Sequence, residues 1–418
     1  MRKPGALETV LHAFTSRRMA VVLLQGFVCG IPLALTFATL QAWMATEKVD
    51  LTLIGIFSLV GLPYTVKFLW APLMDRYVPP FLGRRRGWIL VCQVALMISI
   101  SALAFSQPAQ APGVVAVLAL LVAFCSSSQD IVVDAYRTEI LSQEEFGVGS
   151  SLYVMGYRIA MLVSGGGALI LSDHMSFRAV YLIMASTMLL GVFTTLIAPE
   201  PEVRAAPPKS IHEAFILPLV EYFKRRGAIE TLLFLIVYKL DSNLTVAMTT
   251  PFMLSIGFSK TDIGAVVKGG GTIATVLGAI VGGGMMVKLG LRRSLWIFGI
   301  SQAIAGLTYM ILAHLGHNYP FMVAAITTEN FFSGMGIAAQ SALMMSLCDK
   351  RFTATQYSLL ASFMGLSRYV AGAPSGWLAK TFGWEHYFLI CALAGIPGLL
   401  MLLRLKAWKM PNAAKASS

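Results

Sequence analysis

The chain has 418 residues, of which 57% are hydrophobic and only 12% are charged. Soluble globular domains contain about 25% charged residues, so this composition excludes a soluble protein. The formal net charge of +12 would suit a nucleic-acid-binding protein, but the cations gather in short connections between apolar segments. We therefore predict an all-α membrane protein whose partner is the lipid bilayer and not nucleic acid.

Twelve apolar segments follow one another, and a helix needs roughly 20 apolar residues to cross a bilayer. We predict membrane helices at 19–45, 51–73, 88–107, 113–136, 147–172, 177–198, 229–254, 261–288, 292–315, 319–347, 354–379 and 383–405. The sixth connection is the longest and combines prolines with an amphipathic segment. We therefore predict an N-terminal six-helix bundle (1–198), a cytoplasmic linker (199–228), and a C-terminal six-helix bundle with a short tail (229–418).

The basic residues are unequally divided between the two sides of these helices. One side has both termini, the linker and clusters such as Arg84–Arg86 and Arg292–Arg293. The opposite connections contain only four basic residues: Lys48, Arg178, Lys260 and Lys380. Since Lys and Arg are enriched in cytoplasmic loops, we predict that both termini lie in the cytoplasm.

The two predicted bundles repeat one another. The connection after the second helix reads D-R-Y-V-P-P-F-L-G-R-R-R-G-W (75–88), and the one after the eighth reads K-L-G-L-R-R-S-L-W (288–296). Gly156 in the fifth helix and Gly365 in the eleventh are 209 positions apart, as are Gly167 and Gly376. A duplicated helical unit predicts a secondary transporter with its substrate held between the halves, near the middle of the membrane.

Nine ionisable residues lie inside the apolar segments, where each is energetically costly and usually marks a transport path or a paired structural site. They are Lys67, Asp130, Asp134, Arg158, Lys239, Asp241, Lys268, Glu329 and Arg368. The histidines and cysteines show neither metal-ligand spacing nor a nucleophile–base pattern. We therefore predict a transporter and not an enzyme, with no metal site and no cofactor.

Seven stretches, in order along the chain, identify a family. They are G-I-P-L-A-L-T-x-x-T-L-Q-A-W-M (30–44), I-G-I-F-S-L-V-G (54–61), K-F-L-W-A-P-L-M-D-R-Y (67–77), S-S-Q-D-I-V-V-D-A (127–135), Y-K-L (238–240), E-N-F-F-S-G-M-G (329–336) and T-A-T-Q (353–356). With the repeated basic turns, they resemble the AmpG-type muropeptide permeases of the major facilitator superfamily.

The resemblance implies proton-driven import of 1,6-anhydromuropeptides across the inner membrane of a Gram-negative bacterium. This import serves peptidoglycan recycling and, indirectly, β-lactamase induction. We expect a monomer whose partners are the small-molecule substrate and protons. A siderophore importer of the same superfamily is the alternative, and a lipid flippase or a non-transporting sensor is a more distant one.

Two carboxylates on the predicted fourth helix are candidates for proton coupling. Asp130 and Asp134 are one helical turn apart and share a face. Either carboxylate could bind and release a proton. Alternatively, each could form a fixed salt bridge, and the partner of Asp134 would then be Arg137. Glu329, near the middle of the tenth helix, is the third proton-coupling candidate. Alternatively, Glu329 and Asn330 could bind sugar hydroxyls of the cargo, or Glu329 could pair with a cation.

Candidate substrate-binding residues lie near the middle of several helices. They are Gln129, Tyr157, Arg158, Lys239, Asp241, Asn330 and Arg368. The cations could meet carboxylates of the cargo, or they could pair with protein acids and hold helices together. The family often has an acidic residue three positions after the helix 7 lysine, whereas Asp241 follows Lys239 by two, about 100° round a helix from that face.

A further charged set lies at the predicted cytoplasmic turn between the second and third helices. Asp75 is followed, across a Pro-Pro turn, by Arg84, Arg85 and Arg86. Several charges at one helix end form a network, although a single surface pair contributes little. We predict that this set is a gate that holds the two bundles in one state, and the alternative is that it only directs topology.

Overall fold

The computed structural model describes residues 16–50, 57–201, 208 and 210–407, and within them the chain is helical without a strand. The first half contains α2 (Arg17–Thr36), α3 (Ala38–Thr46), η1 (Phe57–Gly61), α5 (Leu62–Val66), η2 (Lys67–Leu69), α6 (Ala71–Arg76), α7 (Arg84–Ala104), α8 (Pro112–Ile140), α9 (Phe146–Met161), η3 (Leu162–Gly167), α10 (Ala168–Ser172), α11 (Phe177–Ser186) and α12 (Met188–Ile197). The connecting helix is α13 (Ile211–Phe223). The second half contains α14 (Ala228–Val237), α15 (Leu240–Ser255), α16 (Lys260–Ile263), η4 (Gly264–Gly270), α17 (Gly271–Leu289), α18 (Leu291–Leu315), α19 (Tyr319–Leu347), α20 (Thr353–Ala394), α21 (Ile396–Met401) and η5 (Leu402–Ala407).

The prediction of an all-α membrane fold is confirmed. In the described part of the chain, 9 helical stretches are long and apolar enough to cross a membrane. The last of them, Thr353–Arg404, contains two passes because Gly383, with φ of 73°, interrupts the helix. The 29-residue helix α19 and the broken stretch from η1 to α6 (57–76), which contains the apolar helix Leu59–Leu69, account for the other two of the twelve passes. Residues 51–56 of the predicted second helix lie outside the described residues.

Three predicted helices differ from the observed ones near the charged residues. α7 begins at Arg84 and not at residue 88, because Gly83, with φ of 81°, ends the preceding turn. α8 continues to Ile140, beyond the predicted end at 136, so Arg137 and Glu139 also lie inside the helix. The predicted helix 229–254 is two helices separated at Lys239, whose φ of −108° and ψ of 7° are not helical. Sequence periodicity misses such a break because both halves are apolar.

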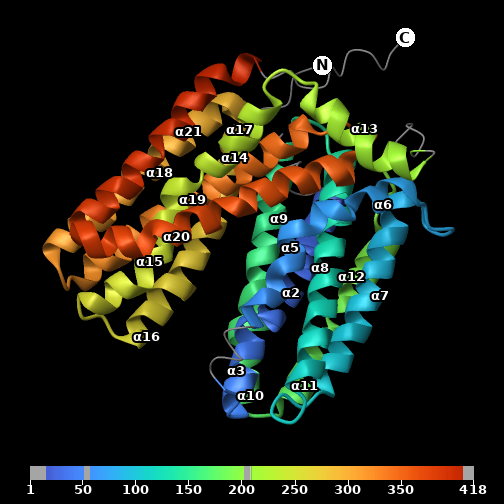
Figure 1. Ribbon diagram of the computed structural model, residues 1–418, viewed down its shortest axis with the longest axis horizontal. Helices are drawn as coiled ribbons and strands as arrows, with labels where there is room; N and C mark the ends of the chain where they lie inside the picture. Colours follow the sequence, from blue (N-terminus) through green and yellow to red (C-terminus); the bar gives the residue numbers. More distant parts are fainter. Residues whose placement is uncertain (1–15, 51–56, 202–207, 209, 408–418) are drawn as a thin grey trace.

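Figure 1 shows the helices in two groups, α2–α12 in blue to green and α14–α21 in yellow-green to red. We call them the N-terminal group and the C-terminal group, and we call the end of the molecule that carries α13 the α13 end. At the α13 end the groups touch, with α9 against α17 and with α6 and α8 against α20. Toward the opposite end the ribbons of the two groups diverge (Figure 1).

Small residues allow α9 and α17 to approach closely. A Cβ atom added at Gly283 of α17 would lie 2.9 Å from the carbonyl oxygen of Gly147 on α9. The Ser151 hydroxyl on α9 donates a 2.6 Å hydrogen bond to the carbonyl oxygen of Ala279 on α17. Close backbone approach of this kind is how membrane helices associate without a hydrophobic driving force.

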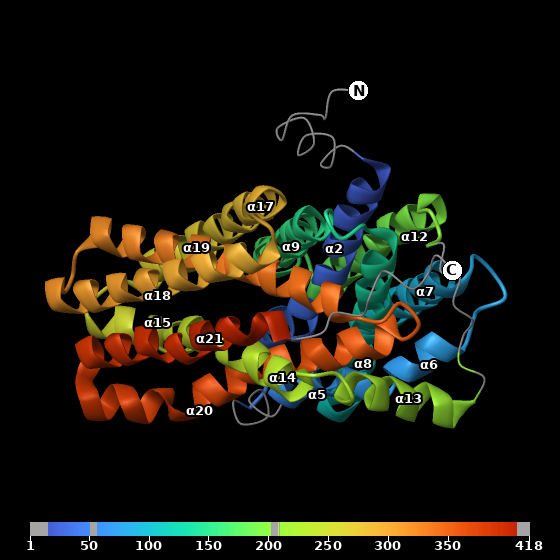
Figure 2. The ribbon, with the colours of Figure 1, turned by 90° about the horizontal axis from the view of Figure 1, so that it is seen from above.

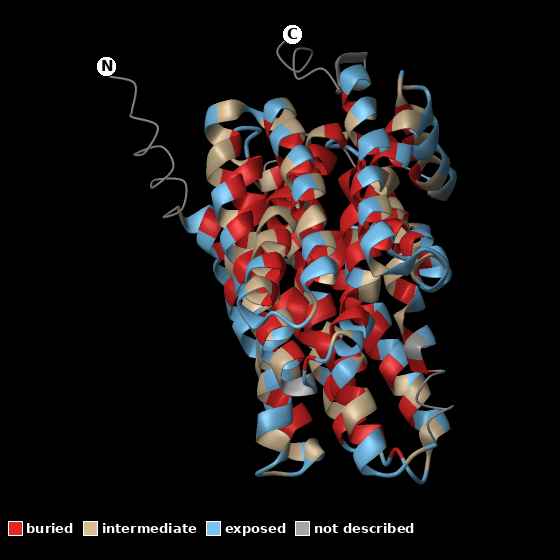
Figure 3. Cartoon of the chain, turned by 90° about the vertical axis from the view of Figure 1, so that its left-hand side faces the viewer, coloured by how far each residue is buried: buried red, intermediate tan, exposed pale blue. Residues whose placement is uncertain are grey.

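The outer surface of both groups is apolar. Figure 3 shows buried residues along the interior of the helix array and exposed residues along its outside. The exposed side chains include Ile98, Val117, Ile170, Ile229 and Ile304, each more than half accessible. An apolar exterior over this length is the surface that a bilayer covers.

Candidate functional site

A cavity of about 300 Å³, lined by both polar and apolar side chains, lies between the two helix groups. The N-terminal group contributes Tyr64 and Thr65 of α5 to its lining, and the C-terminal group contributes α15, α19 and α20. The Thr65 and Tyr369 hydroxyls are 3.4 Å apart across it. A cavity with polar walls from both groups suits a polar ligand that contacts both at once.

Two arginines, one in each group, present uncompensated positive charge at this interface. Arg368 of α20 lines the cavity and is exposed, and Arg158 of α9 is half-buried. The two guanidinium groups are close enough to repel one another. Among the residues that the structure describes, no carboxylate pairs with either of them and no side chain accepts a hydrogen bond from them. Two neighbouring cations without acids to neutralise them favour an anionic ligand.

Lys239 lies at the break between α14 and α15, and its ammonium group turns into the C-terminal group. It donates hydrogen bonds to Gln302 Oε1 at 3.0 Å and to the carbonyl and hydroxyl oxygens of Ser333 at 3.2 and 3.0 Å. The Ser333 hydroxyl is 3.1 Å from that of Ser242, which donates to Glu329 Oε1 at 2.7 Å. Lys239 and Glu329 are therefore joined through two serines, without direct contact. Lys239 lines the cavity but already has protein partners.

Asp241 and Asn330 face neighbouring helices instead of the cavity. Asp241 is in the first turn of α15, where Oδ1 accepts the Ser242 N–H at 2.6 Å. Its Oδ2 lies close to Gly395 of the neighbouring segment. A Cβ atom added at Gly395 would be 3.2 Å from this oxygen. Asn330 Oδ1 accepts from Thr275 Oγ1 of α17 at 3.2 Å. The predicted substrate-binding roles of Asp241 and Asn330 remain predictions, and these contacts offer them no direct support.

The two aspartates of α8 have different surroundings. Asp134 Oδ2 is 3.4 Å from Lys67 Nζ, and its Oδ1 accepts from Arg137 Nη2 at 2.8 Å and Nε at 3.0 Å. Asp130 is buried one turn away, and its Oδ1 accepts no hydrogen bond from the described residues. Two cations therefore balance the charge of Asp134, whereas Asp130 lies outside that cluster.

The remaining predicted residues of the N-terminal group lie around Asp130. Gln129 is fully buried, and its Nε2 donates to Cys29 Sγ of α2 at 3.2 Å. Tyr157 is half-buried, with its ring 6.1 Å from that of Tyr153. Gln129 thus faces α2 rather than the cavity between the groups.

Arg137 bridges the two groups, a role that sequence reasoning missed. Besides Asp134, its guanidinium donates to Ser341 Oγ at 2.9 Å and to the Tyr357 hydroxyl, both in the C-terminal group. The guanidinium carbon Cζ also lies over two aromatic rings, 4.4 Å from the ring centroid of Tyr153 and 5.0 Å from that of Tyr357. The spacing of Asp134 and Arg137, three residues apart on a helix, was the available signal. Its partners across the interface could not be read from sequence.

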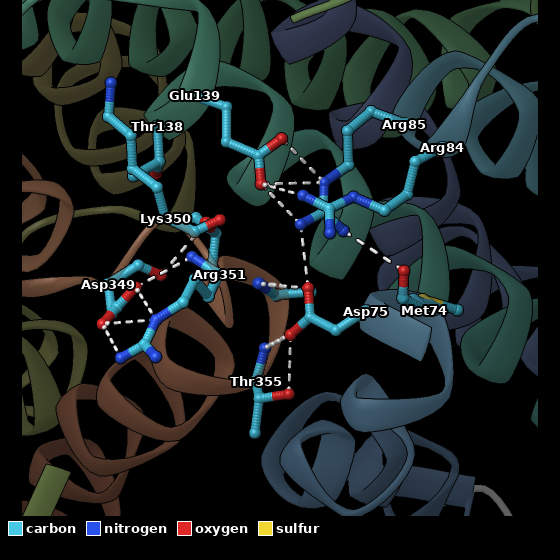
Figure 4. Close-up of polar contacts among 12 residues, drawn as sticks. Met74, Asp75, Arg84, Arg85, Thr138, Glu139, Asp349, Lys350, Arg351 and Thr355 are labelled. Carbon is cyan, nitrogen blue, oxygen red and sulfur yellow. Dashed lines mark hydrogen bonds and ion pairs between the residues drawn. The ribbon is translucent and has the colours of Figure 1, made fainter. Parts of the chain in front are cut away.

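Asp75 also bridges the groups, at the α13 end. This fully buried carboxylate accepts the Thr355 N–H at 2.8 Å, the Thr355 hydroxyl at 2.7 Å and the Ala354 N–H at 3.2 Å. These donors are in the first turn of α20, where free N–H groups and the helix dipole favour an anion. Arg85 Nη2 donates to the same carboxylate at 2.8 Å (Figure 4). Asp75 thus joins α6 of one group to the start of α20 of the other.

The three arginines after Asp75 do not act alike. Arg85 pairs with Glu139 at 2.5 Å as well as with Asp75, and Arg84 pairs with Glu139 at 3.3 Å (Figure 4). Arg86 instead donates to the carbonyl oxygens of Thr195 and Leu196, at the end of α12. Only Arg85 therefore contacts Asp75 directly. Glu139, which sequence reasoning did not identify, balances the charge of the cluster.

Comparisons with known proteins agree with this architecture. The family model described as "Major Facilitator Superfamily" matches residues 22–367 and 231–417. The anhydromuropeptide permease of Escherichia coli (strain K12) is 44% identical, over 94% of this chain and 80% of the permease. A protein of Rickettsia bellii described as "Putative transporter AmpG 1" is 33% identical, over 94% of this chain and 98% of that protein. The solved fucose:proton symporter FucP of E. coli is similar in fold, with a TM-score of 0.73 at 14% identity, over 92% of this chain and 97% of FucP.

Proposed function

Since this chain belongs to the major facilitator superfamily and, within it, to the family of the anhydromuropeptide permeases, we propose that it imports 1,6-anhydromuropeptides from periplasm to cytoplasm. The observation that carries the proposal is a pair of uncompensated arginines: Arg368, which lines the cavity, and Arg158, close enough to repel it. Muropeptides have several carboxylates together with sugar hydroxyls, and such a cavity complements both. Their import supplies peptidoglycan recycling.

The α13 end faces the cytoplasm in this proposal. Basic clusters such as Arg84–Arg86 lie there, in agreement with the preference of cations for cytoplasmic loops. Because the two groups touch at this end, the described conformation corresponds to a carrier closed toward the cytoplasm. We infer that residues 1–198 and 229–418 move as two bodies, with 199–228 as their connection, so that the cavity opens to each side in turn.

Proton coupling is assigned to Asp130 and Glu329. Each is a buried carboxylate with one oxygen, Asp130 Oδ1 or Glu329 Oε2, that accepts no hydrogen bond from the described residues. A buried acid without an ion-pair partner is the kind of group that proton relays in transporters use. Asp134, held by Lys67 and Arg137, instead connects the proton site to the contact between the groups.

The gate can be tested by substituting Asp75. Asp75→Asn keeps the size of the side chain, but it removes the charge that attracts Arg85 and the first turn of α20. The population should therefore shift toward the conformation open to the cytoplasm. Spin labels at the α13 ends of α8 and α19, measured by double electron–electron resonance, should show a longer mean distance.

The matched control for the gate is Asp173→Asn, an exposed aspartate at the opposite end. It should leave the distance distribution unchanged. Ligand affinity in Asp75→Asn should change only by the population factor. An unchanged distance together with a lost binding site would mean that Asp75 serves folding or topology.

The cargo is tested by direct binding and uptake. Purified protein should bind an anhydro-disaccharide with its stem peptide, and proteoliposomes should accumulate it when the outside is acidic. A ferric siderophore, the cargo of the alternative that the comparisons do not favour, should neither bind nor compete. Siderophore binding without muropeptide binding would overturn the proposal.

A further inference from the structure

The connecting helix α13 has two apolar faces, of which only one packs on the protein. Ala214, Pro218 and Tyr222, spaced at four residues, are buried. On another face, Ile216, Leu219, Val220 and Phe223 are between 36% and 49% exposed. Their spacing of three, four and seven positions puts these four side chains on one stripe. In the described part of the chain this stripe therefore stays partly open at the surface.

The exposed stripe is part of a larger surface, which we call the α13 platform. Three exposed side chains of the neighbouring turn after α6, Tyr77, Val78 and Phe81, belong to it, since α13 packs beside α6 (Figure 2). Lys224 and Arg226, exposed at the end of α13, supply positive charge. The platform consists of Tyr77, Val78, Phe81, Ile216, Leu219, Val220, Phe223, Lys224 and Arg226. Aromatic and aliphatic side chains next to cations are the composition of helices that lie in a membrane interface.

Continuity with the bilayer-facing surface identifies the occupant. α13 is joined through Gly227 to α14, where Ile229 and Leu233 are 72% and 50% exposed on the outside of the helix array. The platform therefore lies where a membrane-spanning helix begins. We propose that it binds anionic phospholipids of the inner leaflet, with its apolar stripe among the upper acyl chains and Lys224 and Arg226 on headgroup phosphates.

The platform is coupled to the gate through the start of α20. Gln356 Nε2 donates to the carbonyl oxygen of Pro218 on α13 at 3.2 Å. Arg225, which directly follows Lys224, donates to Gln356 Oε1 at 3.2 Å and to the Leu347 carbonyl oxygen at 2.5 Å. Gln356 is in the first turn of α20, the same turn that Asp75 caps. Lipid bound to the platform therefore holds α20 in the position that closes the cytoplasmic side.

An ion pair adds a second link between α13 and this turn. Arg351 Nη2 is 2.8 Å from Asp349 Oδ2 and 3.6 Å from Glu221 Oε2 of α13. Burial would raise the pKa of Asp349, but hydrogen bonds and charge from Arg351 outweigh it and lower that pKa. Asp349 thus stays ionised at neutral pH and keeps Arg351 beside α13. The lipid effect on the gate rests on the proposed function, whereas lipid contact at the platform does not.

Lipid contact is tested with a fluorophore on the apolar stripe. A bimane on Val220→Cys, in full-length protein in nanodiscs, should be quenched by lipids with a nitroxide near the headgroup and protected from aqueous iodide. The five natural cysteines are buried, so the label reports position 220. The same label on Glu144→Cys, in an exposed loop at the same end, should show the opposite pattern. Quenching of the Val220 label by iodide alone, or energy transfer between copies, would overturn the proposal.

Lipid charge is tested without substrate. Adding phosphatidylglycerol to phosphatidylcholine nanodiscs should lower the fraction open to the cytoplasm several-fold, measured by the spin-label distance between α8 and α19. Lys224→Gln with Arg226→Gln should abolish this response, and the control pair Arg292→Gln with Arg293→Gln should retain it. An equal response in both pairs would overturn the coupling. Because neither assay needs a muropeptide, failure of the proposed cargo would leave both results interpretable.

Discussion

Replacing Asp130 with asparagine is expected to abolish accumulation of muropeptide driven by a pH gradient. Asparagine keeps the size and polarity of the side chain but cannot ionise, so the variant has no proton to release at this position. Substrate exchange at equal pH on both sides should remain measurable, because Asp130 is not among the residues that line the cavity. Proteoliposomes with an acidic exterior give the measurement: internal substrate should reach the external concentration and rise no further.

Two comparison variants make this result specific. Asp173→Asn, an exposed aspartate outside the network, should accumulate substrate normally. Asp134→Asn should behave differently from Asp130→Asn, because it removes the partner of Lys67 and Arg137 and leaves two buried cations uncompensated. Loss of stability in detergent is the expected sign of that change. Normal gradient-driven accumulation by Asp130→Asn would remove Asp130 from the coupling mechanism.

The sequence predicts the helices well because apolar length alone determines them. Segments such as 319–347 need no knowledge of their neighbours to be recognised as helices, and α19 has those bounds. The break at Lys239 was not predicted, because local hydropathy is the same on both sides of it. In the structure the break places Lys239 between two helices and Asp241 in the first turn of α15, whereas the prediction put both residues inside one continuous helix.

The candidate site was predicted by residue type and not by arrangement. A buried charge is conspicuous in an apolar segment, so Asp130, Arg158 and Glu329 were identified. Which charges pair depends on contacts between helices far apart in sequence, such as Asp75 with Thr355 or Arg137 with Tyr357. Lys239 already has protein partners in the structure, so Arg158 and Arg368 become the stronger candidates for binding the anionic groups of the cargo. The structure also shows that Arg137 and Glu139 belong to these charge networks. From the sequence alone they are only charged residues near the end of a helix.

Neutralising Arg368, which lines the cavity, or the neighbouring Arg158 is expected to weaken muropeptide binding by about 10- to 150-fold. Loss of one charge-assisted hydrogen bond costs roughly 1.5–3 kcal/mol, which corresponds to that range. Arg368→Gln keeps a polar side chain at the cavity wall and removes only the charge and the forked donors. The loss should be larger for muropeptides with a stem peptide, which adds carboxylates, than for the bare anhydro-disaccharide.

The stability of the empty protein separates a binding role from a structural one. Arg158 and Arg368 repel one another and, within the described part of the chain, have no acid between them, so removing one charge should leave the ligand-free melting temperature unchanged or higher. If the arginine instead held the helices together, its removal would lower the melting temperature. Lys380→Gln, the same charge change at an exposed position of α20, should alter neither affinity nor melting temperature. Titration calorimetry and thermal unfolding of the three proteins give both readouts. Equal weakening for both ligands together with a lower melting temperature would assign Arg368 to holding the helices and not to the cargo.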